Sequence, residues 1–348
     1  MKYLILLLAC FIFSNCAKNK IEYHAITSNH KQLGDGYSAF QKEIYYKQSS
    51  PGYSSNLHFP EKTEMHFGTF TNLDNRYAKD KTNIYYRGEA ISNVDLNSFS
   101  VIKLESEFPF YEKSILNPKK KYQLRQKIQK DIVTISPSLI SFTSIRWEIT
   151  HMEYYAKDKN NVYCGKDTIL NADPNTFKIL SILFSKDKSN VYFKGEPISN
   201  SDSQSFDIIS GFLASDDNHI YYGDKVISQD PELFEILNFN YVKDDELVWF
   251  IRNLVFPRIE VLYGCSAKDF EIIDNRYAKD ASNVFFHGSI IEKANVENFQ
   301  VLGQNWSKDD KNIFKVNRLC SEIDYDTFEV TDEYVKDKNR SYEKKYKP

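Results

Sequence analysis

The sequence predicts an all-β protein, a tandem array of about eight β-hairpin repeats of about 29 residues each. An aromatic-x-Lys-Asp-x-x-Asn motif recurs, and from Asp158 onward its aspartates lie 28 or 29 residues apart, with one interval of 36. The apolar content is rich in Tyr (24) and Phe (25) and poor in Gly (12), a bias that favours strands. One hairpin cannot bury its own apolar face, so we expect neighbouring repeats to stack.

The first sixteen residues are typical of a lipoprotein export signal. Met1 and Lys2 supply a positive charge, and the apolar run 3–13 is shorter than the ~20 residues that cross a bilayer. The segment ending at Cys16 resembles a bacterial lipobox, although Asn15 replaces the usual Gly or Ala. We therefore predict lipidation of Cys16, attachment to a membrane through this lipid, and location in the bacterial cell envelope. An ordinary cleaved signal and an uncleaved anchor are the alternatives.

The rest of the chain divides by its periodicity. Residues 17–69 are an N-terminal segment with a degenerate repeat between Tyr37 and Tyr46, which lacks the aspartate. Residues 70–345 are the repeat array, interrupted by insertions at about 105–147 and 252–260.

Within one repeat, alternation predicts a strand that runs from Phe-x-Val-Leu into Tyr-x-Lys. The Asp-x-x-Asn pair predicts a turn, because both side chains bond nearby backbone. Val-Tyr-Tyr is then the returning strand. Asp-Pro sequences at Asp173 and Asp230 predict a single helical turn before the next repeat. The turn residues singled out are Asp80, Asn83, Asp158, Asn161, Asp187, Asn190, Asp280, Asn283, Asp309 and Asn312.

The repeats are expected to form an elongated or curved stack. A closed propeller-like ring is the alternative, although about 29 residues is short for a four-stranded blade.

Three cysteines follow Cys16, and an odd number argues against a disulfide framework. The repeat alignment places Cys164 in an aromatic slot and Cys320 in an aliphatic slot, so we interpret both as small buried hydrophobes. The same alignment assigns Val226 to the aliphatic slot.

The recurrent Asp-Lys-x-Asn-x-Tyr-Tyr resembles the signature of the DKNYY family of bacterial repeat proteins, over most of residues 70 to 345. The resemblance implies association with the cell envelope. It implies no established activity, and it therefore brings no catalytic residues to this chain.

Two features of the repeat suggest binding chemistry. The turn aspartates could suggest calcium, but there is one acid per repeat with Lys beside it, whereas calcium loops gather several oxygen ligands. We therefore expect no metal and no cofactor. The lysine before each aspartate would form a column that contacts an anionic envelope polymer such as a glycan, or would protect a strand edge from pairing. These lysines are Lys79, Lys157, Lys186, Lys243, Lys279, Lys308 and Lys336.

The first insertion carries a basic segment with Leu124 and Ile128 four residues apart, which indicates a short amphipathic helix. It could contact anionic lipid headgroups, or it could be a solvated insertion packed by those two residues. The basic residues are Lys119, Lys120, Lys121, Arg125, Lys127 and Lys130.

The leading functional hypothesis is a non-catalytic, lipid-anchored envelope protein whose array binds an envelope protein or glycan. The sequence has no Gly-rich phosphate loop or other catalytic motif. Its net charge of −3 gives no argument for nucleic acid. The alternative is an envelope hydrolase with a site in the non-repeat segments, where Glu61, Glu64, His66 or His151 could participate.

Overall fold

The computed structural model describes residues 30–47, 61–103, 154–252, 258–303, 305–331 and 333–344. These residues fall into two compact units, the first ending at Phe206 and the second beginning at Asp207. Cys16, the basic segment 119–130 and His151 lie outside the described residues.

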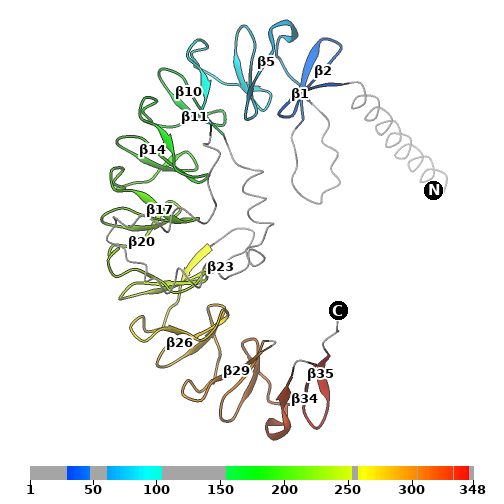
Figure 1. Cartoon of the computed structure of the whole chain (residues 1–348), viewed down its shortest axis with the longest axis vertical. Helices are drawn as coiled ribbons and strands as arrows, with labels where there is room; N and C mark the ends of the chain where they lie inside the picture. The colour runs from blue at the N-terminus through cyan, green and yellow to red at the C-terminus, as the bar shows by residue number, and fades with distance from the viewer. Residues whose placement is uncertain are drawn as a thin grey trace, which may run out of the picture. The chain divides into compact units, whose positions relative to one another are not determined.

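Small antiparallel sheets follow one another along the chain in both units (Figure 1). The described residues form nine such sheets, eight with four strands and the last with three, and the strands of each sheet lie side by side in chain order. The prediction of an all-β tandem array is confirmed.

The first unit holds four sheets. Their strands are β1 Lys31–Gly34, β2 Tyr37–Phe40, β3 Glu43–Tyr46, β4 Glu61–Lys62; β5 Thr71–Asp74, β6 Tyr77–Lys79, β7 Ile84–Tyr86, β8 Glu89–Ala90; β9 Ser100–Val101, β10 Tyr155–Lys157, β11 Val162–Cys164, β12 Asp167–Thr168; and β13 Lys178–Ile179, β14 Phe184–Lys186, β15 Val191–Phe193, β16 Glu196–Pro197. A 3-10 helix, η1 Phe67–Thr69, precedes β5.

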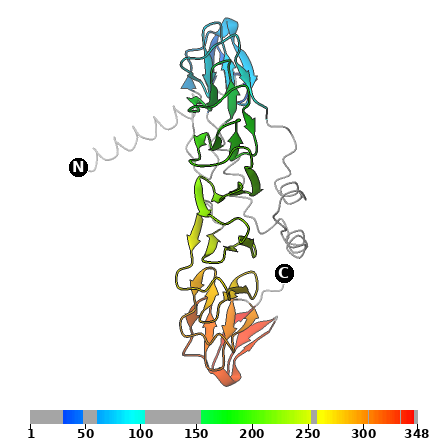
Figure 2. The ribbon, with the colours of Figure 1, turned by 90° about the vertical axis from the view of Figure 1, so that its left-hand side faces the viewer.

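The second unit holds five sheets, whose short strands Figure 2 shows from the side. They are β17 Asp207–Ser210, β18 Leu213–Ser215, β19 Ile220–Tyr222, β20 Lys225–Ser228; β21 Glu235–Ile236, β22 Tyr241–Lys243, β23 Val248–Arg252, β24 Arg258–Val261; β25 Glu271–Ile272, β26 Tyr277–Lys279, β27 Val284–Phe286, β28 Ser289–Ile290; β29 Gln300–Gly303, β30 Trp306–Lys308, β31 Ile313–Lys315, β32 Arg318–Leu319; and β33 Glu329–Val330, β34 Tyr334–Lys336, β35 Ser341–Lys344. The 3-10 helix η3 Tyr325–Thr327 precedes β33.

The prediction of one strand from Phe-x-Val into Tyr-x-Lys was wrong, because the chain reverses between these two motifs. In the fourth sheet, Ser181 Oγ accepts the N–H groups of Leu183 and Phe184 at 3.1 Å each, and this turn separates β13 from the antiparallel β14. Each strand is only two to five residues long in the described residues. About 29 residues are therefore enough for four strands, contrary to the expectation from the sequence.

The degenerate repeat in the N-terminal segment forms a complete sheet, β1 to β4. In place of Asp-x-x-Asn, Gln41 and Lys42 make a two-residue turn with positive φ of 51° and 64°, the geometry of a type I′ hairpin. Tyr37 and Tyr46 are buried as in the regular repeats.

Rings from successive sheets form the core inside each unit. The Phe that follows each connection sits between two of them: the Phe270 ring centre lies 5.4 Å from that of Tyr241 in the preceding sheet and 5.6 Å from that of Phe285 in its own. Val226 is an exception to the predicted pattern, since it is 41% exposed. The buried position facing Ile220 belongs to Ser228, because a register shift interrupts the pairing of β19 with β20.

Each sheet has two distinct ends. The end we call the Asp end carries the turn between the second and third strands and the connection to the next sheet. The opposite, Gly end carries the turns between the first and second strands and between the third and fourth. Three intervals between described strands, 48–60, 104–153 and 253–257, lie outside the described residues, and the strands that flank each of them end at the Gly end of their own sheet.

Candidate functional site

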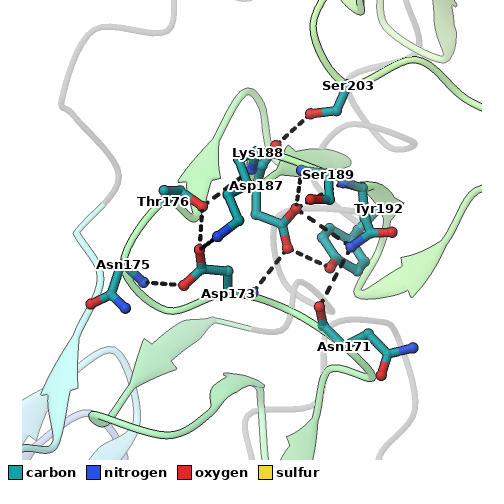
Figure 3. Close-up of polar contacts among 10 residues, drawn as sticks. Asn171, Asp173, Asn175, Thr176, Asp187, Lys188, Ser189, Tyr192 and Ser203 are labelled. Carbon is teal, nitrogen blue, oxygen red and sulfur yellow. Dashed lines mark hydrogen bonds and ion pairs between the residues drawn. The ribbon is translucent and has the colours of Figure 1, made fainter.

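The turn aspartate bonds both its own turn and the preceding connection. Asp187 Oδ1 accepts the N–H groups of Ser189 (Figure 3) and of Asn190 at 2.7 Å each. Its Oδ2 accepts the Tyr192 hydroxyl at 2.8 Å and the N–H of Asp173 at 2.9 Å. Asp173 belongs to the connection that leaves the previous sheet, so one buried carboxylate joins two successive repeats.

The same bond to the preceding connection recurs along both units. The N–H groups of five further connection residues donate to the Oδ2 of a turn aspartate at 2.8 or 2.9 Å. The pairs are His66 to Asp80, Asp95 to Asp158, Ser266 to Asp280, Asn295 to Asp309, and Asp324 to Asp337. In the remaining pair inside the second unit, Ser228 Oγ takes the place of the backbone donor and lies 2.7 Å from Asp244 Oδ2.

These bonds lower the pKa of five turn aspartates. Burial by itself would raise the pKa of Asp187, but the N–H groups of Asp173, Ser189 and Asn190 together hold that pKa below its ordinary value. The same causes, with burial opposed by backbone N–H groups, lower the pKa values of Asp80, Asp158, Asp309 and Asp337. A carboxylate held ionised by N–H donors is suited to joining backbone segments.

Lysines reinforce the same joint on the solvent side. Lys188 Nζ lies 3.1 Å from Asp173 Oδ2, and Lys159 and Lys338 make the equivalent contact at 2.6 Å with Asp95 and Asp324. The Asn175 N–H, and after it the Lys188 ammonium group, lower the pKa of Asp173 to about 2. The lysines are more than half exposed, so each pair contributes little to stability.

The lysine before the aspartate lies in the second strand of each sheet, so the idea that it protects a strand edge was wrong. Its ammonium group reaches the following connection: the Nζ atoms of Lys157, Lys186 and Lys243 donate to the carbonyl oxygens of Pro174, Ser203 and Ala267 at 2.7 to 2.8 Å. Lys279 instead pairs with Glu271 at 3.0 Å. Lys336 pairs with Glu329 at 3.8 Å, so five of the seven lysines contact their own array rather than forming a free column.

The cysteines lie in apolar clusters. Cys164 and Cys320 are half-buried, and no disulfide joins the cysteines of the described residues. Burial raises the pKa of Cys265 to about 11. Cys164 packs closely against Gly195 of the next sheet. Gly195 has φ +87°, and a Cβ on it would lie only 2.8 Å from the Cys164 Cβ.

The residues proposed for a hydrolase are on the surface where the structure describes them. Glu61, Glu64 and His66 are all exposed. Within the described ranges, no three His, Cys, Asp or Glu side chains are grouped so that they could hold a metal ion. In the same part of the chain, no helix has the length and apolar character that a membrane crossing requires.

One cluster was missed by the sequence reasoning, at the Gly end of the sheet β21–β24. The hairpin β23–β24 is longer than its counterparts and places Arg252 directly opposite Arg258. Arg252 lies 5.3 Å from the Phe250 ring centre and its Nη2 is 3.1 Å from Glu260 Oε2. The 36-residue interval had marked this place as an insertion, but spacing alone could not show which residues face each other.

The next sheet supplies two more groups to this cluster. The His287 ring centre is 6.3 Å from that of Phe250, and the His287 N–H donates to the Arg276 carbonyl oxygen at 2.9 Å. Burial lowers the pKa of His287, and the positive charges of Arg276 and Arg252 lower it further. Cationic groups from two sheets therefore act on one imidazole.

The comparisons with known proteins agree with the repeat architecture. A model of the DKNYY family matches residues 12–127, 155–318 and 214–346. No curated protein and no solved structure matches the chain. The matched segments include most of the residues that form the sheets, the degenerate first one among them, and the chain belongs to the DKNYY family.

Proposed function

We propose that the protein is a non-catalytic, lipid-anchored protein of the bacterial cell envelope whose array presents a binding surface to an envelope protein or glycan. The observation that carries the proposal is that the side chains repeated in every period bond to the protein's own backbone. Asp187, Lys186 and their equivalents join successive sheets through backbone groups. Their recurrence is thus accounted for by construction of a framework, which leaves binding to the parts that differ between repeats.

The strands that flank those parts end at the Gly end. The intervals 48–60, 104–153 and 253–257 interrupt the period there, whereas the Asp end keeps the same bonds from sheet to sheet. A framework with one regular end and one variable end suits a binding protein, because loops on a rigid scaffold carry recognition. The basic residues between Lys119 and Lys130 belong to one of these intervals and are proposed to contact anionic headgroups near the anchor.

The export-type N-terminus supports the lipid anchor. Feeding cells a radiolabelled fatty acid should label the wild-type protein and not Cys16→Ser. Cys10→Ser is the matched control, since Cys10 is the other cysteine of the leader. Equal labelling of wild type and Cys16→Ser would refute the anchor at this residue.

The binding role is tested in intact cells. Cross-linking of the anchored protein, followed by mass spectrometry and glycan analysis, should recover a defined envelope partner. Recovery of no protein or glycan above the level of an unrelated lipoprotein would contradict the proposal.

A further inference from the structure

We propose that Arg252 and Arg258, paired across strands β23 and β24, bind a phosphate group together with Arg276 of the adjoining sheet β25–β28. The inference rests on the proposed binding role of the array but does not depend on lipidation. All its residues belong to the second unit and come from two successive sheets.

The hairpin register brings the first two guanidinium groups together. Arg252 pairs with Arg258 and Phe250 pairs with Glu260, and residues directly opposite in an antiparallel pair project on one face. Phe250 lies on the face of the hairpin that packs against sheet β25–β28. Its ring is so close to Gly288 of that sheet that a Cβ on Gly288 would lie only 2.6 Å from the Phe250 Cγ. The arginines therefore extend on the side of the hairpin that faces β25–β28.

The facing sheet contributes Arg276 and His287. Both lie in turns at its Gly end, joined by the N–H of His287 and the carbonyl oxygen of Arg276. The His287 ring packs against Phe250 and Phe286 at 6.3 and 4.7 Å between ring centres. This packing holds the imidazole against the hairpin, and the backbone bond joins His287 to the turn that carries Arg276. One guanidinium nitrogen of Arg276 donates to the side-chain oxygen of Asn305 in the following sheet, which leaves its other N–H groups for a ligand.

The positive charge of the cluster is incompletely balanced. Like charges placed directly opposite on a strand pair destabilise it, and Glu260 contacts only one of the two arginines, Arg252. Among the described residues, Arg258 has no ion-pair partner. The other nearby acid, Asp274, uses its Oδ1 to accept the N–H groups of Arg276 and Tyr277 at 2.7 Å each.

A phosphate group fits this arrangement better than a carboxylate. Guanidinium groups bind phosphate and carboxylate oxygens through paired N–H donors. A carboxylate offers two oxygens in one plane, whereas a phosphate monoester or diester offers oxygens in several directions, as required by arginines from two sheets. Phosphate would also offset the repulsion between Arg252 and Arg258.

The experiment uses the purified protein and inorganic phosphate as the probe. Phosphate should raise the melting temperature and bind in calorimetry. Arg258→Gln and Arg276→Gln should each weaken binding about tenfold, which corresponds to ~1.4 kcal/mol. Arg340→Gln is the matched control, because it removes an exposed arginine at the Asp end of the last sheet.

Two further readouts separate a binding site from a structural role. In phosphate-free buffer Arg258→Gln should melt no lower than wild type, because it removes a like-charge contact. Phosphate should shift the NMR titration of the His287 imidazole to higher pH, because a bound anion opposes the effect of Arg252 and Arg276 on that pKa. The resonance is assigned with His287→Gln.

A second arm distinguishes the sources of phosphate. Vesicles of phosphatidylglycerol and phosphatidylcholine test a lipid headgroup, and inorganic phosphate tests the free anion; binding to either through Arg258 supports the site. Absence of phosphate effects on melting and on His287 would overturn the proposal, as would an Arg340→Gln defect equal to that of Arg258→Gln. If phosphate does not bind but cross-linking finds a partner elsewhere on the array, the phosphate site is refuted and the proposed binding role stands.

Discussion

Replacing Asp187 by Asn tests whether the turn carboxylate joins two sheets in addition to shaping its own turn. Asn keeps one acceptor oxygen and is itself common in turns, so the bonds from Ser189 and Asn190 can persist. The side-chain amide then replaces Oδ2, and the Asp173 N–H loses its acceptor.

The cost follows from that lost acceptor. A buried N–H left without a partner costs ~1–3 kcal/mol, and replacing a charged acceptor by a neutral one weakens the other bonds as well. We expect the joint to lose ~2–3 kcal/mol. Tyr192→Phe should cost less, about 1 kcal/mol, because it removes one hydroxyl and the equivalent positions Phe285 and Phe314 lack it naturally.

Hydrogen exchange measured by NMR under native conditions reports the joint directly. A loss of ~2 kcal/mol should speed exchange of the Asp173 amide about 30-fold, with a smaller effect on the amides of Ser189 and Asn190. Asp167→Asn, on the exposed strand β12, is the control and should change none of them. Unchanged protection of the Asp173 amide in Asp187→Asn would refute the reasoning.

Three other predictions concern the same framework. Gly195→Ala should destabilise the protein by ~1–3 kcal/mol, since its φ is +87° and the new methyl group meets Cys164; Gly211→Ala, with φ +53° and open space, should cost less in urea unfolding, and equal costs would contradict the packing argument. Lys186→Met should lower the urea midpoint through loss of the bonds to the Ser203 and Phe206 carbonyl oxygens, whereas a midpoint equal to wild type would show that these bonds contribute nothing. The lowered pKa values of the buried turn aspartates stabilise the protein fully above the unfolded pKa of ~3.9, so the urea midpoint should fall as the pH drops below about 4; a midpoint that stays constant or rises from pH 5 to pH 3 would contradict this assignment.

The sequence predicted the repeat, its strand-rich character and the turn at each Asp-x-x-Asn, because these depend on local chemistry and on a fixed period. It did not predict the reversal between Ile179 and Phe184. Apolar residues continue on both sides of that reversal, and Ser181, whose hydroxyl closes the turn, looks like any single polar residue in a strand.

The contacts between sheets were also beyond local reasoning. Lys186 looked like a solvent-facing residue because the sequence does not show that its ammonium group reaches Ser203 in the following connection. Likewise Arg252 and Arg258 were recognised only as part of an insertion at about 252–260, since their opposition depends on the register of β23 with β24. Register and packing between repeats require the three-dimensional arrangement.

The joint made by Asp187 has a consequence for how such a chain can change in length. A regular period carries a carboxylate that receives the connection behind it and a connection that reaches the carboxylate ahead, as Asp173 and Asp187 do. A gene duplication or deletion of one whole regular period therefore brings together two surfaces that already fit. Copy number can vary without a newly evolved interface, whereas a change of half a period would leave one carboxylate without its donor.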